Sequence, residues 1–412
     1  MPERTDLVSE LVCVKCGAHH APTLEYTCPA CGPTGILDIR YDLDAVAASM
    51  TPAALAARPH DIFRYRELLP LDPTGRRPPQ PVGWTPIIDA PRLAEAWGLR
   101  RVLVKDEGRN PTASFKDRAS AVGVARALQV GATTIACAST GNAASSLAGM
   151  AAGVGLPAFI FVPARAPEPK IAQLRIFGAT VFRVDGTYDE AWELCQAACA
   201  RFGWYNRNCA VNPTLVEGKK TGGLEAAEQL GAAMPDWVVV SVGDGCTIAG
   251  VVKGLREMHT LGFIPHMPRV LGVQATGARP LADAFFAHAD LVPVPVDTIA
   301  DSIAVGHPRN WRKALLALRD CDGTFVDVED EAILDAMRLT ARLAGVFGEP
   351  AGVAAAAGLA RAREKGIITA DESALVMVTG SGLKDVKSAL VAAGPPIDVP
   401  NDLKALDAFV VR

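Results

Sequence analysis

Residues 110–118 read Asn-Pro-Thr-Ala-Ser-Phe-Lys-Asp-Arg and follow a short β-branched run, Val102–Lys105. An Ala-rich stretch at helical spacing, Lys116–Gln129, begins inside this segment. From about residue 81 onward, the same order of a short apolar run and a longer Ala-rich stretch repeats along the chain. This order predicts an α/β fold with mainly parallel sheets flanked by helices. Ligands of such folds bind at the carboxyl ends of strands, which is where residues 110–118 fall.

The repeating pattern predicts seven strands and eight helices. The expected strands are residues 102–105, 134–138, 158–162, 180–184, 237–242, 270–274 and 375–379. The expected helices are residues 116–129, 143–153, 169–177, 189–202, 221–230, 248–258, 331–344 and 351–365. A further Ala-rich stretch, residues 47–57, looks helical but is interrupted by Pro52.

Two cysteine pairs set residues 1–40 apart. They are Cys13-x-x-Cys16-Gly and Cys28-Pro-x-Cys31-Gly, with eleven residues between them. Each glycine allows a tight turn that aims two thiolates at one point, and four thiolates make a closed tetrahedral zinc site. Because such a site has no open position, we expect structural Zn²⁺ on Cys13, Cys16, Cys28 and Cys31. The alternative is a former zinc ribbon that folds without metal.

Composition narrows the class of protein. The chain has 412 residues, with 41 Lys and Arg against 45 Asp and Glu, and a formal net charge of −4. This balance argues against nucleic acid or an acidic membrane surface as a partner, since both require a basic face. The first six residues are polar, and no apolar run approaches the ~20 residues of a membrane helix. We therefore expect a cytoplasmic protein without a secretory signal.

The division of the chain follows from these patterns. We expect a cysteine-rich knuckle at 1–40, a linker and N-terminal arm at 41–80, a catalytic fold at 81–395 and a C-terminal tail at 396–412. Within the catalytic fold, a smaller substrate-binding subdomain is expected at about 125–215.

Four loops at strand ends carry candidate chemistry. Lys116 would stand in the first turn of a helix, whose positive dipole end lowers a lysine pKa and favours a Schiff base with an aldehyde. Residues 139–144, Ser-Thr-Gly-Asn-Ala-Ala, also open a helix, where backbone N–H groups hold a carboxylate. Asn142 in this loop suits a phenolic oxygen. The plain alternatives are a solvated lysine and a helix cap.

The other two loops are rich in glycine. Residues 243–247, Gly-Asp-Gly-Cys-Thr, precede a helix and let amide groups crowd a phosphate. Thr379, at the end of the last expected strand, offers a hydroxyl to a ring nitrogen. Taken together, the four loops supply an amine, a phosphate cradle, a partner for a phenol and a partner for a pyridine nitrogen. Pyridoxal 5′-phosphate (PLP) requires all four.

Five motifs resemble the threonine synthase family of fold-type II PLP enzymes, the tryptophan synthase β-like group. They stand at residues 110–118, 139–142 (Ser-Thr-Gly-Asn), 217–221 (Glu-Gly-Lys-Lys-Thr), 348–351 (Gly-Glu-Pro-Ala) and 379–385 (Thr-Gly-Ser-Gly-Leu-Lys-Asp). The resemblance covers about residues 60–390. It implies two open, mainly parallel sheets flanked by helices, an amino-acid substrate and a homodimer.

The resemblance also implies a role for each matching position. Lys116 would carry the cofactor and move protons, and Asn142 would contact the phenolic oxygen. The cofactor phosphate would lie on Gly243, Asp244, Gly245, Cys246 and Thr247, and the pyridine nitrogen on Thr379. Ser139, Thr140 and Gly141 would take the substrate carboxylate. Threonine synthase converts O-phosphohomoserine and water to threonine and phosphate.

The chain departs from the family pattern before Glu217. A basic residue is expected near Leu215, with polar residues near Cys209 and Ala210, to bind the substrate phosphate. Without them, Lys219 and Lys220 are the candidates for that role. The departure leaves a sister enzyme as the alternative: a threonine or serine dehydratase, a diaminopropionate ammonia-lyase or a cysteate-synthase-like β-replacement enzyme. A non-catalytic protein that keeps the fold is a third reading, against which the retained Lys116 argues.

Overall fold

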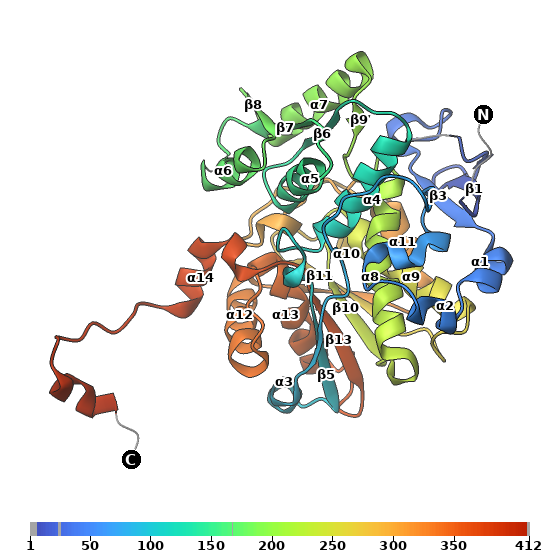
Figure 1. Ribbon diagram of the computed structural model, residues 1–412. Helices are drawn as coiled ribbons and strands as arrows, with labels where there is room; N and C mark the ends of the chain where they lie inside the picture. Colours follow the sequence, from blue (N-terminus) through green and yellow to red (C-terminus); the bar gives the residue numbers. More distant parts are fainter. Residues whose placement is uncertain (1–5, 24–25, 167, 410–412) are drawn as a thin grey trace.

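The structure is a computed structural model that describes residues 6–23, 26–166 and 168–409. Residues 1–5 and 24–25 of the predicted knuckle and 410–412 of the predicted tail lie outside the described residues. Three separate sheets organise the chain: a large and a small sheet in the catalytic part and an antiparallel one near the N-terminus (Figure 1). The predicted fold class, two mainly parallel sheets flanked by helices beside a small N-terminal knuckle, is confirmed.

The large sheet has six strands in the order β12-β11-β10-β13-β5-β4. All neighbours run parallel except β4, which pairs antiparallel with β5. Alternate side chains face opposite sides, so Leu103 joins the core under α8, α9 and α11, whereas Val102 and Val104 join the core under α3, α12 and α13. The strands are β4 (Ile87–Asp89), β5 (Arg101–Asp106), β10 (Trp237–Ser241), β11 (Arg269–Ala275), β12 (Thr324–Val328) and β13 (Ser373–Val378).

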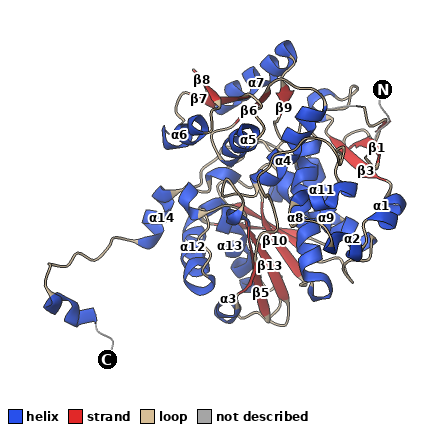
Figure 2. Ribbon diagram, viewed as in Figure 1, coloured by secondary structure: helices blue, strands red, loops and turns tan. Residues whose placement is uncertain are grey.

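Helices cover both faces of this sheet, as buried parallel strands require (Figure 2). One side carries α8 (Thr214–Leu230), α9 (Cys246–Thr260) and α11 (Trp311–Arg319). The other carries α3 (Pro91–Trp97), α12 (Asp330–Ala344) and α13 (Pro350–Glu364). Helix α10 (Pro280–Ala287) packs near α11 and β12.

The small sheet is fully parallel, in the order β8-β7-β6-β9. Its strands are β6 (Ile135–Ala138), β7 (Ala158–Pro163), β8 (Thr180–Val184) and β9 (Tyr205–Asn206). Helices α4 (Lys116–Gln129), α5 (Asn142–Ala152) and α6 (Glu168–Ile176) share one core with this sheet, and α7 (Tyr188–Phe202) covers the opposite face. In Figure 1 this layer lies above the large sheet.

The N-terminal part forms a three-stranded antiparallel sheet, β2-β1-β3, from β1 (Val8–Cys13), β2 (His19–His20) and β3 (Leu37–Tyr41). Two short helices follow, α1 (Leu43–Ser49) and α2 (Pro52–Ala56). Pro52 interrupts the helical stretch as expected, because it begins the second helix at a position where its missing N–H costs nothing. The 3₁₀ segment η2 (Ile62–Leu68) then leads to the catalytic part.

The chain ends in a segment that leaves the body. After α14 (Val386–Ala393) it runs outward to the 3₁₀ segment η7 (Leu403–Phe409) (Figure 1). Among the described residues, no helix combines the length and the apolar character needed to cross a membrane.

Candidate active site

A cavity of about 700 Å³ lies where strands of both catalytic sheets end. Its walls come from the segments that follow β6, β9, β10 and β13 and from the first turns of α4, α5 and α9. Because parallel strands in one sheet end at the same edge, the fold gathers loops that lie far apart in the sequence. All predicted cofactor-binding and substrate-binding residues except Lys220 line this cavity.

Lys116 begins α4 and faces the cavity. The turn before it contains Ala113 with a left-handed φ of 64°, and the Phe115 N–H donates to the Thr379 carbonyl at 2.9 Å. Burial, followed by the positive charges of Lys219 and Arg207, lowers the pKa of Lys116. The sequence predicted a lowered pKa from the helix dipole, but here desolvation and neighbouring cations are its causes. Within the described residues, Nζ of Lys116 has no hydrogen bond or ion pair, so the amine is free to react.

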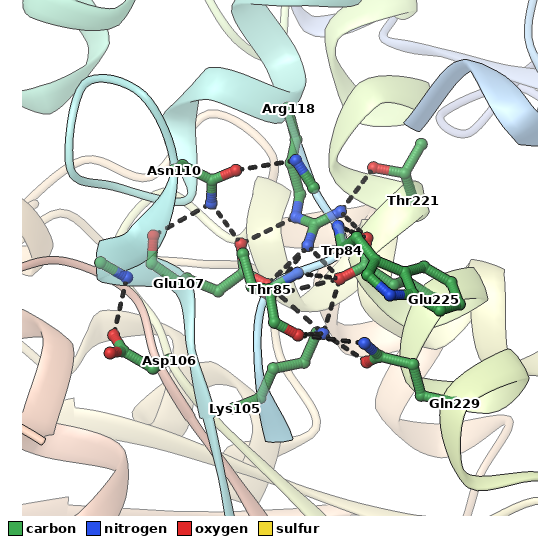
Figure 3. A network of polar contacts seen from close by, with 12 residues as sticks. Trp84, Thr85, Lys105, Asp106, Glu107, Asn110, Arg118, Thr221, Glu225 and Gln229 are labelled. Atoms are coloured by element: carbon green, nitrogen blue, oxygen red, sulfur yellow. Dashed lines mark hydrogen bonds and ion pairs between the residues drawn. The ribbon is translucent and has the colours of Figure 1, made fainter. Parts of the chain in front are cut away.

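A buried ion network anchors the helix that carries Lys116 (Figure 3). Arg118, two residues on, donates to Glu107 at 2.7 Å and to Glu225 of α8 at 2.8 Å. Lys105 of β5 donates to the same Glu225 carboxylate at 2.6 Å. All four side chains are fully buried, and two positive charges balance two negative ones. The ammonium of Lys105 is thereby paired, and its role is structural.

Asn142 begins α5, and Gly141 is the N-cap residue. The Asn142 amide makes no capping hydrogen bond; its Nδ2 donates instead to Oε1 of Glu349 at 2.6 Å and to the Ser302 hydroxyl at 3.3 Å. Ser139, Thr140 and Gly141 stand just before the first turn of α5, where N–H groups lack intrahelical acceptors. The loop therefore presents an anion-binding helix end beside the amide of Asn142, which Glu349 and Ser302 hold in place.

The turn 243–247 leads into α9, a helix of 15 residues. Gly245 has a left-handed φ of 87°, and a Cβ there would lie 2.9 Å from Cβ of Ala314. Glycine thus allows the sharp entry that leaves the first amides of α9 facing the cavity. Oδ1 of Asp244 accepts from the Arg309 N–H at 2.6 Å, and Oδ2 accepts from the Cys246 thiol at 3.3 Å. These two hydrogen bonds fix the carboxylate of Asp244, one of the residues predicted to bind the cofactor phosphate.

The two predicted substrate lysines lie in different surroundings. Lys219 lines the cavity, where its ammonium donates to Sγ of Cys209 at 3.0 Å. Lys220 lies outside the cavity, fully buried between Glu217 at 2.6 Å and Glu257 at 2.9 Å. Its charge is neutralised there, so a contact between Lys220 and the substrate is no longer expected. Leu215, the position where a basic residue was expected, packs fully buried near Gly123 of α4.

Two cavity residues were missed by the sequence analysis. Glu349 is 5 % exposed, and burial raises its pKa to about 7. It belongs to the motif at 348–351, which gave it no role. Arg207 follows the two-residue strand β9 and is 1 % exposed. It belongs to no motif, and only the spatial arrangement brings it near Lys116.

The cavity residues fit PLP by their chemistry. They offer an unpaired amine, a glycine turn at a helix N-terminus, the amide of Asn142 and the hydroxyl of Thr379. A Cβ at Gly243 would lie 2.9 Å from Cα of Ile303, so the turn has no room for a side chain at this position.

The four N-terminal cysteines form a second candidate site. Their Sγ atoms all lie within 4.8 Å of one another. A zinc–sulfur distance of ~2.3 Å puts tetrahedral sulfurs ~3.8 Å apart, so the cluster is close to that size. Gly17 and Gly32 have left-handed φ values of 71° and 58° and close each turn by donating to Cys13 and Cys28, both at 2.9 Å.

Comparisons with known proteins agree with the cavity chemistry. A family model described as "Pyridoxal-phosphate dependent enzyme" matches residues 79–380. A threonine synthase from Methanosarcina acetivorans is 37% identical over 402 residues, which cover 96% of this chain and 97% of the relative. One from Mycobacterium tuberculosis is 38% identical over 348 residues, covering 84% and 94%.

Solved structures show the same fold at lower identity. Diaminopropionate ammonia lyase from Escherichia coli has a TM-score of 0.66 at 23% identity and covers 84% of this chain and 92% of its own. Threonine deaminase isoform 2 from Solanum lycopersicum has a TM-score of 0.64 at 23% identity, covering 75% and 86%. On the extent of the family match and of the relatives' identity, this chain belongs to the pyridoxal-phosphate dependent enzyme family.

Proposed function

We propose that this enzyme is a threonine synthase, which converts O-phosphohomoserine and water to threonine and phosphate. The observation that carries the proposal is that one cavity gathers Lys116, Asn142, the glycine turn and Thr379, in a chain that its threonine synthase relatives match almost end to end. The cytoplasm is the proposed compartment, consistent with ten cysteines of which none forms a disulfide.

The proposed cofactor site assigns one group of PLP to each loop. The amides of residues 243–247 hold the phosphate, Asn142 faces the phenolic oxygen, and the Thr379 hydroxyl faces the ring nitrogen. A neutral hydroxyl does not force this nitrogen to be protonated. PLP, when bound, supplies an electron sink for charge that develops on the substrate.

Lys116 is the proposed base. Its lowered pKa increases the fraction of neutral amine near neutral pH, and a neutral amine is needed to accept a proton. The reaction needs a base that works at Cα and Cβ in turn, and a lysine on a flexible stem at the start of α4 reaches both. The N-terminus of α5, with Ser139, Thr140 and Gly141, holds the substrate carboxylate.

A sister PLP enzyme remains the second candidate because of Leu215. Its apolar side chain is buried, so position 215 offers no charge to a substrate phosphate. A dehydratase or an ammonia-lyase has no distal anion and would not need one.

An assay of the purified holoenzyme distinguishes the two candidates. The substrates are O-phosphohomoserine, threonine, serine, O-phosphoserine and diaminopropionate, with phosphate, ammonia and amino-acid products measured for each. Release of phosphate together with threonine from O-phosphohomoserine is the expected result. Ammonia release from serine, threonine or diaminopropionate, without turnover of O-phosphohomoserine, would reject the synthase in favour of the sister enzyme.

Structural Zn²⁺ is the second proposed ligand of the chain. Four cysteine sulfurs in two turns are the donor set that zinc prefers in closed structural sites. The cluster lies outside the cavity residues, and its proposed role is to stabilise the N-terminal sheet.

A further inference from the structure

Within the described residues, two buried cations on the cavity wall have no carboxylate partner and share the sulfur of Cys209. Arg207 is 1 % exposed and Lys219 is 2 % exposed, and both side chains line the cavity. Across residues 6–23, 26–166 and 168–409, neither cation forms an ion pair with a carboxylate. The counter-charge beside them is the Cys209 thiol, whose pKa is lowered by a hydrogen bond with Cys246 and by the positive charges of Lys219 and Arg207. Burying a charge without a full counter-charge is costly, so two cations against one sulfur point to a further anion that binds between them.

Other buried cations of this protein are paired. Arg118 and Lys105 share Glu107 and Glu225, and Lys220 bonds to Glu217 at 2.6 Å. The fold thus supplies carboxylates to its structural cations. In the part of the chain that the structure describes, Arg207 and Lys219 are buried without a carboxylate partner and both line the cavity, which indicates a binding role for them.

The surrounding contacts hold the two cations in place. Arg207 donates from Nη2 to the Ser120 hydroxyl at 2.8 Å and from Nη1 to Sγ of Cys209 at 3.7 Å. Lys219, from α8, donates to the same sulfur at 3.0 Å. Both side chains therefore converge on one sulfur, which neutralises at most one of the two positive charges.

The nearby carboxylates are already engaged. Asp244 accepts from the Arg309 N–H and from the Cys246 thiol, and Glu349 accepts from Asn142. The two other anions expected in the cavity also have places of their own: the cofactor phosphate at residues 243–247 and the substrate carboxylate at the start of α5. Arg207 and Lys219 are therefore available to bind a third anion.

We infer that Arg207 and Lys219 form the binding site for the distal phosphate of a phosphomonoester substrate. The inference rests on the proposed function and deepens it, because it moves the phosphate contact from the apolar position 215 to two other elements. The guanidinium and the ammonium donate to the phosphate oxygens, and the Lys219–Cys209 contact is exchanged for a contact to phosphate. This assignment replaces Lys220 by Arg207 as the partner of Lys219.

The test measures inorganic phosphate binding to the holoenzyme by calorimetry. Arg207→Met and Lys219→Met are each expected to weaken phosphate binding about tenfold or more, because each removes a charge-assisted bond. Retention of PLP, followed by its absorbance, is expected in both variants. Arg309→Met is the matched control: this cavity arginine already pairs with Asp189 at 3.2 Å, and little change is expected.

Three results would overturn the inference. One is unchanged phosphate affinity in both variants. Another is loss of PLP in proportion to loss of phosphate binding, which would place the cations on the cofactor phosphate. The last is an equal effect of Arg309→Met, which would place the anion at Arg309. If Arg207→Met fails to fold, Arg207→Lys and Lys219→Arg keep the charge and should retain most of the phosphate affinity.

The outcome is separate from that of the proposed function. If the wild type binds phosphate through this pair but does not turn over O-phosphohomoserine, the anion site is supported and the threonine synthase activity is rejected. If O-phosphohomoserine is turned over and its KM is unaffected by Arg207→Met and Lys219→Met, the activity stands and the anion site is rejected.

Discussion

Two lysines on the cavity wall, Lys116 and Lys219, have pKa values that their surroundings shift in opposite directions. Burial disfavours the charged form of both. At Lys116, burial and the charges of Lys219 and Arg207 outweigh the opposing effect of the Cys209 and Cys246 thiols, and the pKa is lowered. At Lys219, the sulfur of Cys209 more than offsets burial, and the pKa is raised. Because their pKa values differ, the two lysines suit different roles. Lys116 can act as nucleophile and base, and Lys219 stays charged as an anion ligand.

Lys116→Ala is expected to abolish turnover, because Lys219 on the same cavity wall has a raised pKa and cannot replace it as the base. Borohydride reduction of the wild-type holoenzyme followed by peptide mapping should find the pyridoxyl group on Lys116. Lys105 serves as the internal comparison, since Glu225 holds its ammonium at 2.6 Å. A pyridoxyl group on Lys105, Lys219 or Lys384 would refute the assignment.

Ionisation of Glu349 makes the stability of the folded protein depend on pH. Burial raises its pKa from 4.5 to about 7, so the folded state binds this proton more tightly than the unfolded state. The stability from this proton is complete below pH ~4.5 and is lost as the pH rises through ~7, by roughly 3 kcal/mol at most. Glu349→Gln keeps an oxygen acceptor for Asn142 but cannot titrate. Its thermal midpoint should therefore fall less than that of the wild type between pH 5 and pH 8, two values chosen to bracket the raised pKa. Equal falls would contradict the protonated carboxyl.

Arg207 and Glu349 show what the sequence could not predict at this scale. The motif residues Lys116, Asn142 and Thr379 were found because each follows a strand and opens a recognisable turn. Arg207 follows a strand of only two residues, and its lack of a carboxylate partner among the described residues becomes visible only when the surrounding carboxylates have been placed. Glu349 was seen in a motif, but its burial, and hence its raised pKa, depends on α5 and α13 coming together.

Among the elements, α8 departs most from the sequence prediction. The expected helix spans 221–230, but the observed one begins at Thr214. Gly218 lies in the part that was missed, and glycine disfavours helices. In the structure, glycine serves close packing: a Cβ at Gly218 would lie 2.5 Å from the Arg118 carbonyl oxygen of α4. The expected strands and helices of the catalytic part otherwise agree with the structure within a few residues. The strands β4, β9 and β12 and the helices α3, α10, α11 and α14 were missed.

The glycine turn before α9 gives a prediction at this scale. Gly245→Ala is expected to weaken PLP binding about tenfold, the loss of one good anion contact, because its Cβ would meet Ala314 and shift the amides at the helix start. Gly262→Ala is the matched control: it follows the same helix with a similar φ of 78°, but a Cβ there meets nothing within 4 Å. PLP titration of the apoenzymes, followed by absorbance, measures the difference. Equal affinity in both variants would remove the turn from the phosphate site.

At the scale of the whole molecule, the N-terminal sheet is bonded to the helices that build the active site. Lys253 of α9 lies 3.2 Å from Asp38 of β3 and 2.7 Å from Glu217 of α8. Lys313 of α11 donates to the Leu37 carbonyl at 2.6 Å. Burial alone would raise the pKa of Asp38, but Lys253 and Lys313 lower it overall. The sheet is thus a support for α8, which carries Lys219 on its opposite side.

Replacing Cys13 and Cys16 together by serine is therefore expected to affect the stability of the whole enzyme before its chemistry. Binding of a structural metal contributes to folding, so loss of two zinc ligands should lower the thermal midpoint and the yield, while the remaining folded enzyme keeps its PLP. Metal analysis of the wild type should give about one zinc per chain, as a four-thiolate site requires. Cys321→Ser is the matched control, since this buried thiol lies outside the cluster. A wild-type protein that is stable without metal and has four reactive N-terminal thiols would show that the knuckle folds on its sheet alone.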